Sequence, residues 1–472
     1  MDRESTEVRE VAKQLLPEPP PFWSRRVFGP SAVFTAMAIG SGELVFWPRL
    51  SLSNGVGVLW IAILVVALQY VMDIEIGRYS LATGESAVVG ATRLWRGWAW
   101  ILLAGTVVPW LWPGWARAGC QLLGGVFSIP EKPLSAASLV LCGVLLAVPA
   151  RVYALLEWLQ TILLVAIFAG VLGLCLLAVG AAGGWLGFWS GFLSGAGAAG
   201  LLRQTLDAHS ADFMALLSGV VFAGAGGILN LGYGLLLCEK KFGMGVHARP
   251  IVGLRHSLGL RSSDEVLPTL SSDPGQSERW RRWLSLSRRE HAMLFMAGNI
   301  FTIIFIALMF YSLVGPGAGG EGMSFLVSAT KRFGDLGVVA AAAFVAVAFA
   351  IFFTSEIGII DITSRIAAGI LFSSLRPRRL SASALYHAVV WFEIIVGIIL
   401  TLIDPRQPFW FLVTSAILNT AVMAVYAALV AELNRRTLPP VARPGVAAIA
   451  ALWVAALVYG GFFLLTLARL RW

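Results

Sequence analysis

The stretch AIGSGELVFW, residues 38–47, places two glycines, a serine and a carboxylate inside a long apolar run. Glu43 falls near the middle of what otherwise reads as a membrane-spanning helix. A charged side chain at that depth costs at least about 2.5 kcal/mol, so it is rare there without a function or a partner. The stretch therefore predicts a membrane helix that is broken at its centre and carries a glutamate at the break.

The composition of the whole chain indicates a membrane protein with many spans. Of its 472 residues, 58% are hydrophobic and 13% are charged, and its mean hydropathy is +0.80. Soluble domains carry about 25% charged residues, so this composition excludes an ordinary soluble domain. Apolar windows of about 20 residues predict eleven spans, near 28–52, 56–79, 97–118, 134–150, 155–179, 212–237, 290–314, 337–371, 385–403, 408–431 and 445–467.

The chain has a net charge of +9, and its basic residues are distributed unevenly between the two sides of the predicted spans. Most Lys and Arg residues fall on one side of the spans, so the positive-inside rule places the N-terminus in the cytoplasm and the C-terminus outside. We therefore expect a multi-pass protein of the plasma (inner) membrane, with the lipid bilayer and not nucleic acid as its partner. The expected organisation is a disordered cytoplasmic tail (1–27), a first five-helix repeat (28–179), an extracellular connection (180–211), a sixth helix (212–238), a basic cytoplasmic loop (239–289), helices seven to ten (290–431), and a connection with an eleventh helix (432–472).

A second glycine-rich apolar run, VVFAGAGGILNLGYGLLLCEKK at 220–241, has the same character as the first, FTAMAIGSGELVFWPRL at 34–50. The two runs open two consecutive sets of five predicted spans. Paired interrupted helices at corresponding positions in two halves are the best sequence indication of a transporter binding site at the membrane midplane. Small residues can also serve close helix packing alone, but the neighbouring Glu43 and Asn230 favour a functional break.

Four segments of the chain, taken in order, are similar to those of a known family. They are FGPSAVFTAMAIGSGE (28–43), LWIAILVVALQY (59–70), IGRYSLATGESA (76–87) and ELNRRTLPP (432–440). Their succession and spacing resemble the Nramp metal transporters, the natural resistance-associated macrophage proteins. The resemblance implies an all-α integral membrane protein of the LeuT type, a 5+5 inverted repeat with about eleven transmembrane helices, of which helices 1 and 6 are broken at the midplane.

The metal-binding motifs of that family are replaced in this chain. The family's first helix breaks at Asp-Pro-Gly-Asn, and the matching stretch here is Gly-Ser-Gly-Glu at 40–43. The family's sixth helix carries Met-Pro-His before an asparagine, whereas Gly-Ile-Leu at 227–229 precedes Asn230 here. The acidic residues of the family's proton route in the third span are also missing. The resemblance is therefore to a divergent branch, in which the scaffold is kept and the site is rebuilt.

The rebuilt site offers oxygen ligands only. Without the methionine thioether it loses the family's means of preferring softer ions such as manganese and iron. A carboxylate, an amide, a hydroxyl and freed backbone carbonyls suit a hard cation such as Mg²⁺, which keeps several waters and needs one or two carboxylates. We therefore expect a small divalent cation as transported substrate, with no resident cofactor, held by Glu43 and Asn230 as metal ligands together with Gly40, Ser41, Gly42, Gly224 and Gly227.

A second interpretation makes the substrate a small organic amine or amino acid. The small residues beside Glu43 and around Asn230 would then leave an open cavity. Phe46, Trp47 and Tyr233 would wall it and bind the solute by cation–π contact, with Glu43 supplying the charge.

Two further interpretations involve no transport. Glu43 could pair with Arg49 or Arg117 and bind nothing. A membrane sensor or interaction protein would instead take its inputs through the 239–290 loop, where ERWRRWLSLSRRE at 278–290 could form a basic amphipathic helix on the inner leaflet. No nucleophile–base arrangement, phosphate loop or zinc signature in the sequence indicates an enzyme.

Other ionisable residues in the eighth span have separate expected roles. Asp361 and Arg365 are four residues apart on one predicted helix, so they are expected to share a face and form a structural ion pair. Glu356, with Thr354 and Ser355, is expected either to form a second cation or proton site against the first helix or simply to be paired.

The remaining ionisable residues are expected either at the ends of spans or, for Glu393, within one. Asp73, Glu75 and Arg78 end the second span and are expected to form a solvated or paired cluster. Glu393 lies inside the ninth span and has no obvious partner in the sequence. The five histidines are all expected in loops or at span ends, at His209, His247, His256, His291 and His387.

Overall fold

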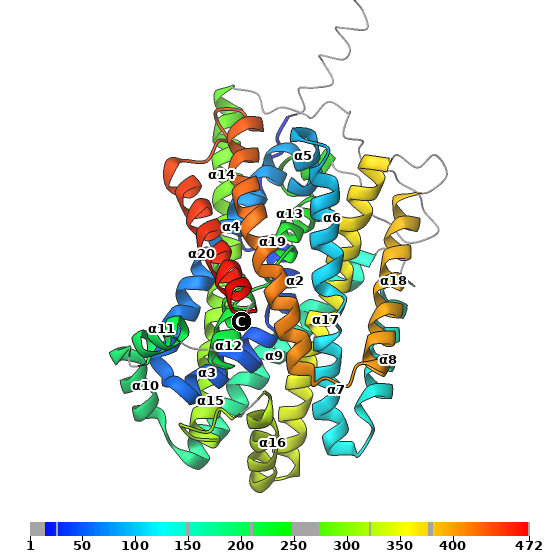
Figure 1. Cartoon of the computed structure of the whole chain (residues 1–472). Helices are drawn as coiled ribbons and strands as arrows, with labels where there is room; N and C mark the ends of the chain where they lie inside the picture. The colour runs from blue at the N-terminus through cyan, green and yellow to red at the C-terminus, as the bar shows by residue number, and fades with distance from the viewer. Residues whose placement is uncertain are drawn as a thin grey trace, which may run out of the picture.

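The computed structural model describes residues 15–24, 27–147, 152–195, 197–207, 211–247, 273–320, 322–375 and 381–470. All regular structure in these ranges is helical, and the helices form one tall bundle (Figure 1). Seven of the described helices are long and apolar enough to cross a membrane, and the other spans are interrupted or short. The chain is therefore an all-α membrane protein, as its sequence predicts.

The first and sixth spans are both broken. The first consists of α2 (Pro30–Ala38), the π-helical turn η1 (Gly42–Phe46) and α3 (Trp47–Asn54), and the sixth consists of α12 (Ala211–Val221) and α13 (Leu229–Glu239). The sixth span unwinds at Gly226 (φ 72°) and Gly227 (φ 54°), in left-handed conformations that glycine adopts at little cost. A Cβ atom on Gly42 would lie 1.7 Å from the carbonyl oxygen of Phe222. The two breaks therefore touch.

The third span is interrupted as well. Pro109 and Pro113 flank the interruption and lack the backbone N–H that a continuing helix needs. The helices of the first half, apart from the broken first span, are η2 (Val56–Val58), α4 (Leu59–Thr83), α5 (Ala87–Leu94), α6 (Trp98–Val107), η3 (Val108–Trp110), α7 (Gly114–Phe127), α8 (Glu131–Ala147) and α9 (Val152–Ala182), followed by the connecting helices α10 (Trp185–Ser194) and α11 (Ala198–Asp207).

In the second half, the segment expected as a polar loop at 239–289 is helical from Pro274 onward. Its helix α14 (Pro274–His291) continues through the π-helical turn η5 (Ala292–Met296) into α15 (Ala297–Leu313). Trp280 and Trp283 on α14 are buried against the protein, so α14 is an extension of the seventh span and not a separate helix on the leaflet. The later helices are α16 (Ser324–Leu336), α17 (Val338–Leu375), α18 (Ala382–Ile403), α19 (Pro408–Thr437) and α20 (Val446–Leu470), and the 3₁₀ turn η4 (Gly243–His247) follows α13.

Part of the tail expected to be disordered packs on α14. The backbone N–H of Leu16 donates to Gln276 Oε1 at 2.8 Å, and Trp283 Nε1 donates to the carbonyl oxygen of Pro17 at 2.7 Å. Leu16 is fully buried by this contact. The prolines of the LPEPPP segment fix their φ angles and carry no N–H to satisfy, so an extended strap costs little to order. Residues 15–24 are thus ordered on the bundle, and residues 1–14 lie outside the described residues.

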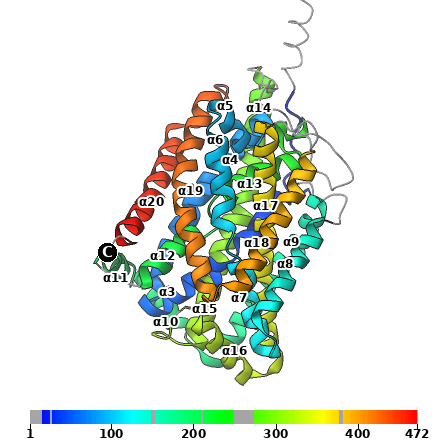
Figure 2. The ribbon, with the colours of Figure 1, turned by 45° about the vertical axis from the view of Figure 1, so that its right-hand side comes forward.

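The bundle encloses the breaks from several sides. Helices α3, α10 and α16 lie toward one end, and α5 and α14 lie toward the other (Figure 1). Helix α20 runs beside α19 along one edge of the bundle (Figure 2). Helix α2 packs against α9, α13 and α17, and α13 also packs along α4. Unwound backbone at membrane depth is tolerated only inside protein or around a ligand, which is where this packing places both breaks.

Candidate functional site

Two side chains satisfy backbone carbonyls that the breaks set free. Gln69 on α4 donates through Nε2 to the carbonyl oxygens of Val220 and Val221, at 3.3 and 3.1 Å, where α12 ends. Ser355 on α17 donates to the carbonyl oxygen of Ile39 at 3.1 Å, where α2 ends. Ser355 therefore reaches the first helix as the sequence predicts, whereas the role of Gln69 is visible only in the structure.

We expect a Gln69→Leu variant to lose about 2–4 kcal/mol of unfolding free energy, because two buried carbonyls lose their donor while the side-chain volume is nearly kept. Thermal unfolding of the purified protein in detergent measures this loss. Gln121→Leu, at a partly exposed position of α7 where the amide makes one long contact of 3.4 Å with Gln407, is the matched control and should stay within about 0.5 kcal/mol of the wild type. A Gln69→Leu variant as stable as this control would contradict the carbonyl-capping role.

Glu43 lies fully buried in η1. Its Oε2 accepts a hydrogen bond from the backbone N–H of Gly40 at 2.8 Å, so the carboxylate caps the break in its own helix. The interpretation that Glu43 pairs with an arginine is wrong. Arg49 lies 3.5 Å from Asp212, and Arg117 lies 2.6 Å from Glu131, so each candidate arginine has another carboxylate as its partner.

Asn230 lies on the first turn of α13, beyond the second break. Its Nδ2 donates to the hydroxyl of Tyr426 on α19 at 2.8 Å and lies 3.5 Å from Gln69 Oε1. The amide of Asn230 therefore bridges two helices, and its oxygen remains for another contact. Tyr426 and Gln69 extend the polar surroundings of the breaks to residues that the sequence motifs did not indicate.

Four acceptor oxygens at the breaks are buried and have no hydrogen-bond partner among the described residues. A buried polar atom without a partner costs about 1–3 kcal/mol, so these lone pairs are available to bind an ion or a polar solute. Three elements supply the atoms: η1 and its N-cap, α13, and α19. They are Ser41 Oγ, Glu43 Oε1, Asn230 Oδ1 and Asn419 Oδ1.

The glycines of the site admit neighbouring groups and do not leave open space. A Cβ on Gly40 would lie 2.6 Å from Ser355 Oγ, and one on Gly224 would lie 2.7 Å from Gln69 Oε1. A Cβ on Gly227 would lie 1.9 Å from Asn419 Oδ1. These glycines therefore bring polar atoms from three other helices close to the breaks.

Aromatic rings cover the breaks on one side. Trp110, Trp115 and Phe222 contact one another, with ring centroids 5.2 to 6.1 Å apart. Phe46 joins this layer, with its ring 6.4 Å from Phe222 and 5.6 Å from Phe409. Phe46, which the sequence offers as a wall of the site, therefore lies within this layer of rings. The tryptophans come from the VPWLWPGW segment of the third span, which carries no predicted role.

The two other predicted wall residues lie elsewhere. Trp47 packs against Gly219 of α12, where a Cβ would lie 3.2 Å from its ring. Tyr233 points away from the breaks, with its ring 4.1 Å from that of His291 and its hydroxyl 3.0 Å from Ser287 Oγ. Neither side chain is therefore where the sequence places it. The position of a residue along its helix does not determine which neighbouring helix its side chain contacts.

A cavity of about 480 Å³ is lined in part by Phe409, whose ring centroid lies 5.6 Å from that of Phe46. Its lining includes Arg49 of α3, Gln121 of α7, Met323 at the start of α16, and Phe409 and Trp410 at the start of α19. The guanidinium of Arg49 lies 5.6 Å from the Phe409 ring. Phe409 thus belongs both to the cavity wall and to the aromatic layer.

The residues predicted as a second site divide into different roles. Glu356 Oε2 accepts from the backbone N–H of Ala116 on α7 at 3.0 Å, so it faces the third span and not the first helix. Thr354 donates to the carbonyl oxygen of Ile351 within its own helix. Asp361 and Arg365 form an ion pair at 2.8 Å, as their spacing implies. Arg365 lies 3.1 Å from Glu239 as well.

The other charged residues of the spans have partners that the structure identifies, some of them far away in the sequence. Glu393 accepts from Thr363 Oγ1 at 2.8 Å. Glu75 and Arg78 pair at 2.6 Å, but Asp73 is not part of that cluster. Its Oδ2 lies 3.2 Å from Nε2 of His291, and both side chains are completely buried. His291 is therefore a core residue at the junction of α14 and η5, and its expected place at the end of a span is wrong because α14 extends that span. His209 and His256 lie outside the described residues.

No family model matches the sequence, and no curated protein matches it. The fold is nevertheless similar to solved transporters. A manganese transporter mutant from Eremococcus coleocola matches with TM-score 0.66 and 12% identity, over 97% of this chain and 90% of that chain. Mhp1, a nucleobase-cation-symport-1 family transporter with bromovinylhydantoin bound, matches with TM-score 0.55 and 15% identity, over 94% and 92%. At these identities the likeness establishes the fold, and the chain is a multi-pass membrane protein with the LeuT fold of secondary transporters.

Proposed function

We propose that this protein is a secondary transporter of the Nramp superfamily that moves a small cation through the broken centres of its first and sixth spans, and that its cargo is a hard divalent ion such as Mg²⁺ in preference to Mn²⁺ or Fe²⁺. The observation that carries this proposal is the set of four buried acceptor oxygens that have no hydrogen-bond partner in the described part of the chain, one of them from the carboxylate of Glu43. Oxygen atoms from carboxylate, amide and hydroxyl groups are the ligands of hard cations.

The ligand chemistry also bears on which metal is favoured. The residues at 39–46 and 222–230 include no histidine, cysteine or methionine. Softer nitrogen and sulfur ligands are what favour transition ions over magnesium, so their absence from these stretches supports a hard cation. The likeness in fold to a manganese transporter supports a metal cargo on this scaffold. Glu43 is the single charge at the breaks, so the ion would keep part of its water shell.

The aromatic layer favours a second candidate, an organic amine or amino acid. Trp115 Nε1 would lie 3.3 Å from a Cβ on Gly40, so the tryptophan stands directly beside the break that Glu43 caps. Aromatic faces bind organic cations, and Glu43 would neutralise an ammonium group. Mhp1, which has bromovinylhydantoin bound, shows that a protein of this fold can hold an organic ligand.

Uptake into proteoliposomes separates the two candidates. We expect saturable uptake of Mg²⁺ by the wild type, with Mn²⁺ taken up more weakly and with no inhibition by an excess of amino acids or aromatic amines. Protein-free liposomes give the background, and a sample shown to be monodisperse after reconstitution gives the control for folding. Uptake of neither metal by such a sample, together with binding of an amine, would overturn the metal proposal in favour of the organic one.

A further inference from the structure

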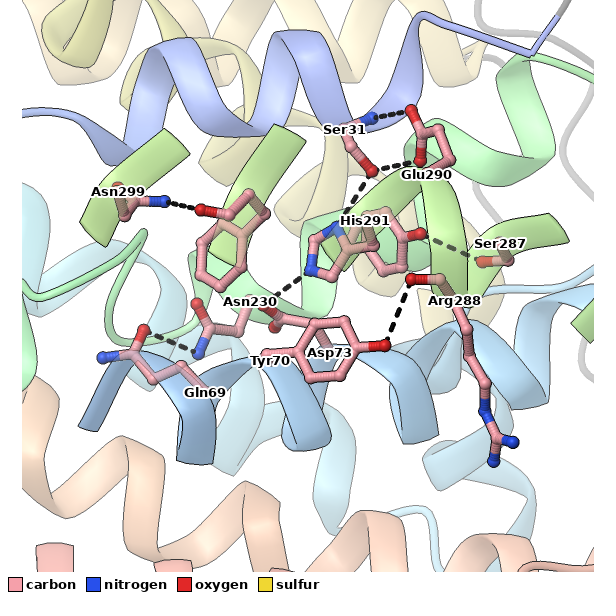
Figure 3. A network of polar contacts seen from close by, with 12 residues as sticks. Ser31, Gln69, Tyr70, Asp73, Asn230, Ser287, Arg288, Glu290, His291 and Asn299 are labelled. Atoms are coloured by element: carbon pink, nitrogen blue, oxygen red, sulfur yellow. Dashed lines mark hydrogen bonds and ion pairs between the residues drawn. The ribbon is translucent and has the colours of Figure 1, made fainter. Parts of the chain in front are cut away.

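A chain of four polar side chains, separate from the breaks, connects three helices in the core (Figure 3). Asp73 Oδ2 on α4 lies 3.2 Å from Nε2 of His291, and Nδ1 of His291 lies 2.9 Å from Oγ of Ser31 on α2. The Ser31 hydroxyl contacts Glu290 Oε2, and the Ser31 backbone N–H donates to Glu290 Oε1 at 3.0 Å. All four residues are 0% exposed.

The number of protons in this chain follows from its donors and acceptors. With Glu290 ionised, Ser31 donates its single hydroxyl proton to Glu290, so Nδ1 of His291 must carry a proton to donate to Ser31. The contact between Nε2 and Asp73 then needs one more proton, on either atom. With Glu290 protonated, Ser31 donates to Nδ1 instead, and Nε2–H donates to Asp73.

As a reference, take the state in which Asp73 and Glu290 are both ionised and His291 is neutral. Each of the arrangements above binds one proton more than this reference state. If that proton leaves, one of the three contacts has no donor, so two acceptors face each other between Asp73 and His291, between His291 and Ser31, or between Ser31 and Glu290. An uncompensated contact of this kind is expensive in a buried site, because no water screens it. The observed set of contacts therefore requires one bound proton, which can move along the chain between Asp73 and Glu290.

The surroundings do not remove this requirement. Tyr70 on α4 stacks on His291 with ring centroids 5.7 Å apart, and its hydroxyl donates to the carbonyl oxygen of Arg288. Other titratable groups also face the chain. Tyr233 of α13 packs on His291, the hydroxyls of Tyr426 on α19 and Tyr459 on α20 interact electrostatically with Asp73, and Lys240, which pairs with Glu157, interacts electrostatically with Glu290. Among the described residues, no lysine or arginine forms an ion pair with Asp73, and Asp73 Oδ1 has no hydrogen-bond partner.

The order Asp–His–Ser also occurs in hydrolase triads, but this chain is not arranged as a nucleophile. The Ser31 hydroxyl is engaged by Glu290 as well as by His291. All four residues of the chain are buried completely, so no acyl group could reach Ser31. Proton binding is the chemistry that a fully enclosed chain of this composition can perform.

We propose that Asp73, His291, Ser31 and Glu290 form a proton-binding latch, which holds α2 against α4 and the α14–η5 junction while one proton is bound. Helix α2 is a nine-residue segment that ends at the Gly40 break, so it can move as a unit once Ser31 is released. The π-helical turn η5 begins directly after His291, and π-turns inside helices often mark functional positions. The latch acts on the scaffold, so it does not depend on which solute is carried.

The accessibility of α2 tests this proposal without any substrate. Thr35 lies on α2, is buried and packs near Gly298 of α15, so a Thr35→Cys thiol should react with a maleimide only when α2 moves. We expect its labelling rate in purified full-length protein, divided by that of the exposed reference Arg281→Cys, to rise about tenfold or more from acidic to alkaline pH, the scale of losing one charge-assisted hydrogen bond. The unmodified chain, whose four cysteines are all buried, gives the background.

Variants of the chain give opposite expected results. In the Thr35→Cys background, Asp73→Asn supplies a permanent N–H to Nε2 of His291 and should keep labelling slow at both pH values. Ser31→Ala breaks the latch and should make labelling fast at both. Tyr70→Phe, which removes a neighbouring hydroxyl but no member of the chain, is the matched control and should keep the wild-type pH response.

A normalised labelling rate that does not change with pH in the Thr35→Cys protein would overturn the proposal. A full wild-type pH response in Asp73→Asn would overturn it equally. If Asp73→Asn does not fold, His291→Gln takes its place, because an amide at that position cannot titrate and should also abolish the pH response. Since no solute is added, these results stand apart from any failure of the uptake experiment.

Discussion

Replacement of Glu43 by glutamine is expected to lower the apparent affinity for transported Mg²⁺ by at least about 100-fold while leaving the protein folded. Glutamine keeps an oxygen that can accept the Gly40 N–H, which Glu43 Oε2 accepts at 2.8 Å. It removes the single charge in the two unwound stretches. Changes to groups that only orient metal ligands already cost about 10- to 100-fold in affinity, so loss of the charged ligand itself should cost more.

This variant distinguishes a ligand from a structural cap. Glu43→Ala removes both the charge and the acceptor of the Gly40 N–H, so it should also lose about 1 kcal/mol of unfolding free energy through the lost cap. If Glu43 served only as a cap, the glutamine variant would transport normally and the alanine variant would be the weaker of the two. The measurement is the concentration dependence of Mg²⁺ uptake in proteoliposomes, read beside the thermal unfolding of each variant.

The matched control for this experiment is Glu393→Gln. Glu393 is also a buried carboxylate in a membrane span, and it also accepts one hydrogen bond, from Thr363. It lies on α18, away from both breaks, so its substitution should leave uptake within a few-fold of the wild type. Equal losses in both variants would point to a general effect of buried charge and would contradict the specific role of Glu43.

The elements that the sequence predicts well are those set by local composition. The glycine-rich stretches 40–42 and 224–227 predict two broken helices, because the residues that break a helix are close together in the chain. The interruption of the third span has a local signal too, in Pro109 and Pro113, although no functional meaning attaches to it in the sequence. Runs of apolar residues mark most of the spans in the same way.

The site is less predictable because its polar contacts join distant segments. Gln69 and Val221 are separated by 152 positions, and Asp73 and His291 by 218. No periodicity or motif links such pairs, and only packing of the bundle decides which of several neighbours each side chain meets. Gln69 did have a weak signal, as a lone amide in a long apolar helix. Asn419 and Tyr426 lie on α19, and no comparable feature of the sequence around them indicates a role at the breaks.

Gly42→Ala is expected to be the most damaging single substitution at the breaks, with a loss of more than about 4 kcal/mol of unfolding free energy or complete failure to fold. The added Cβ would lie 1.7 Å from the carbonyl oxygen of Phe222 and 2.5 Å from its carbonyl carbon. Both atoms belong to the backbone of the other break, so no side-chain rotation relieves the overlap. Thermal unfolding and size-exclusion profiles of the detergent-purified variant measure the effect.

Gly173→Ala is the matched control, because a Cβ at this position of α9 meets nothing within 4 Å. In a helix interior the change from glycine to alanine should be neutral or stabilise by up to about 1 kcal/mol. If Gly42→Ala were as stable as Gly173→Ala, the two breaks could not touch as the structure has them. Glu43 and Asn230 would then have no reason to share one site, since it is the contact at Gly42 that brings the two unwound stretches together.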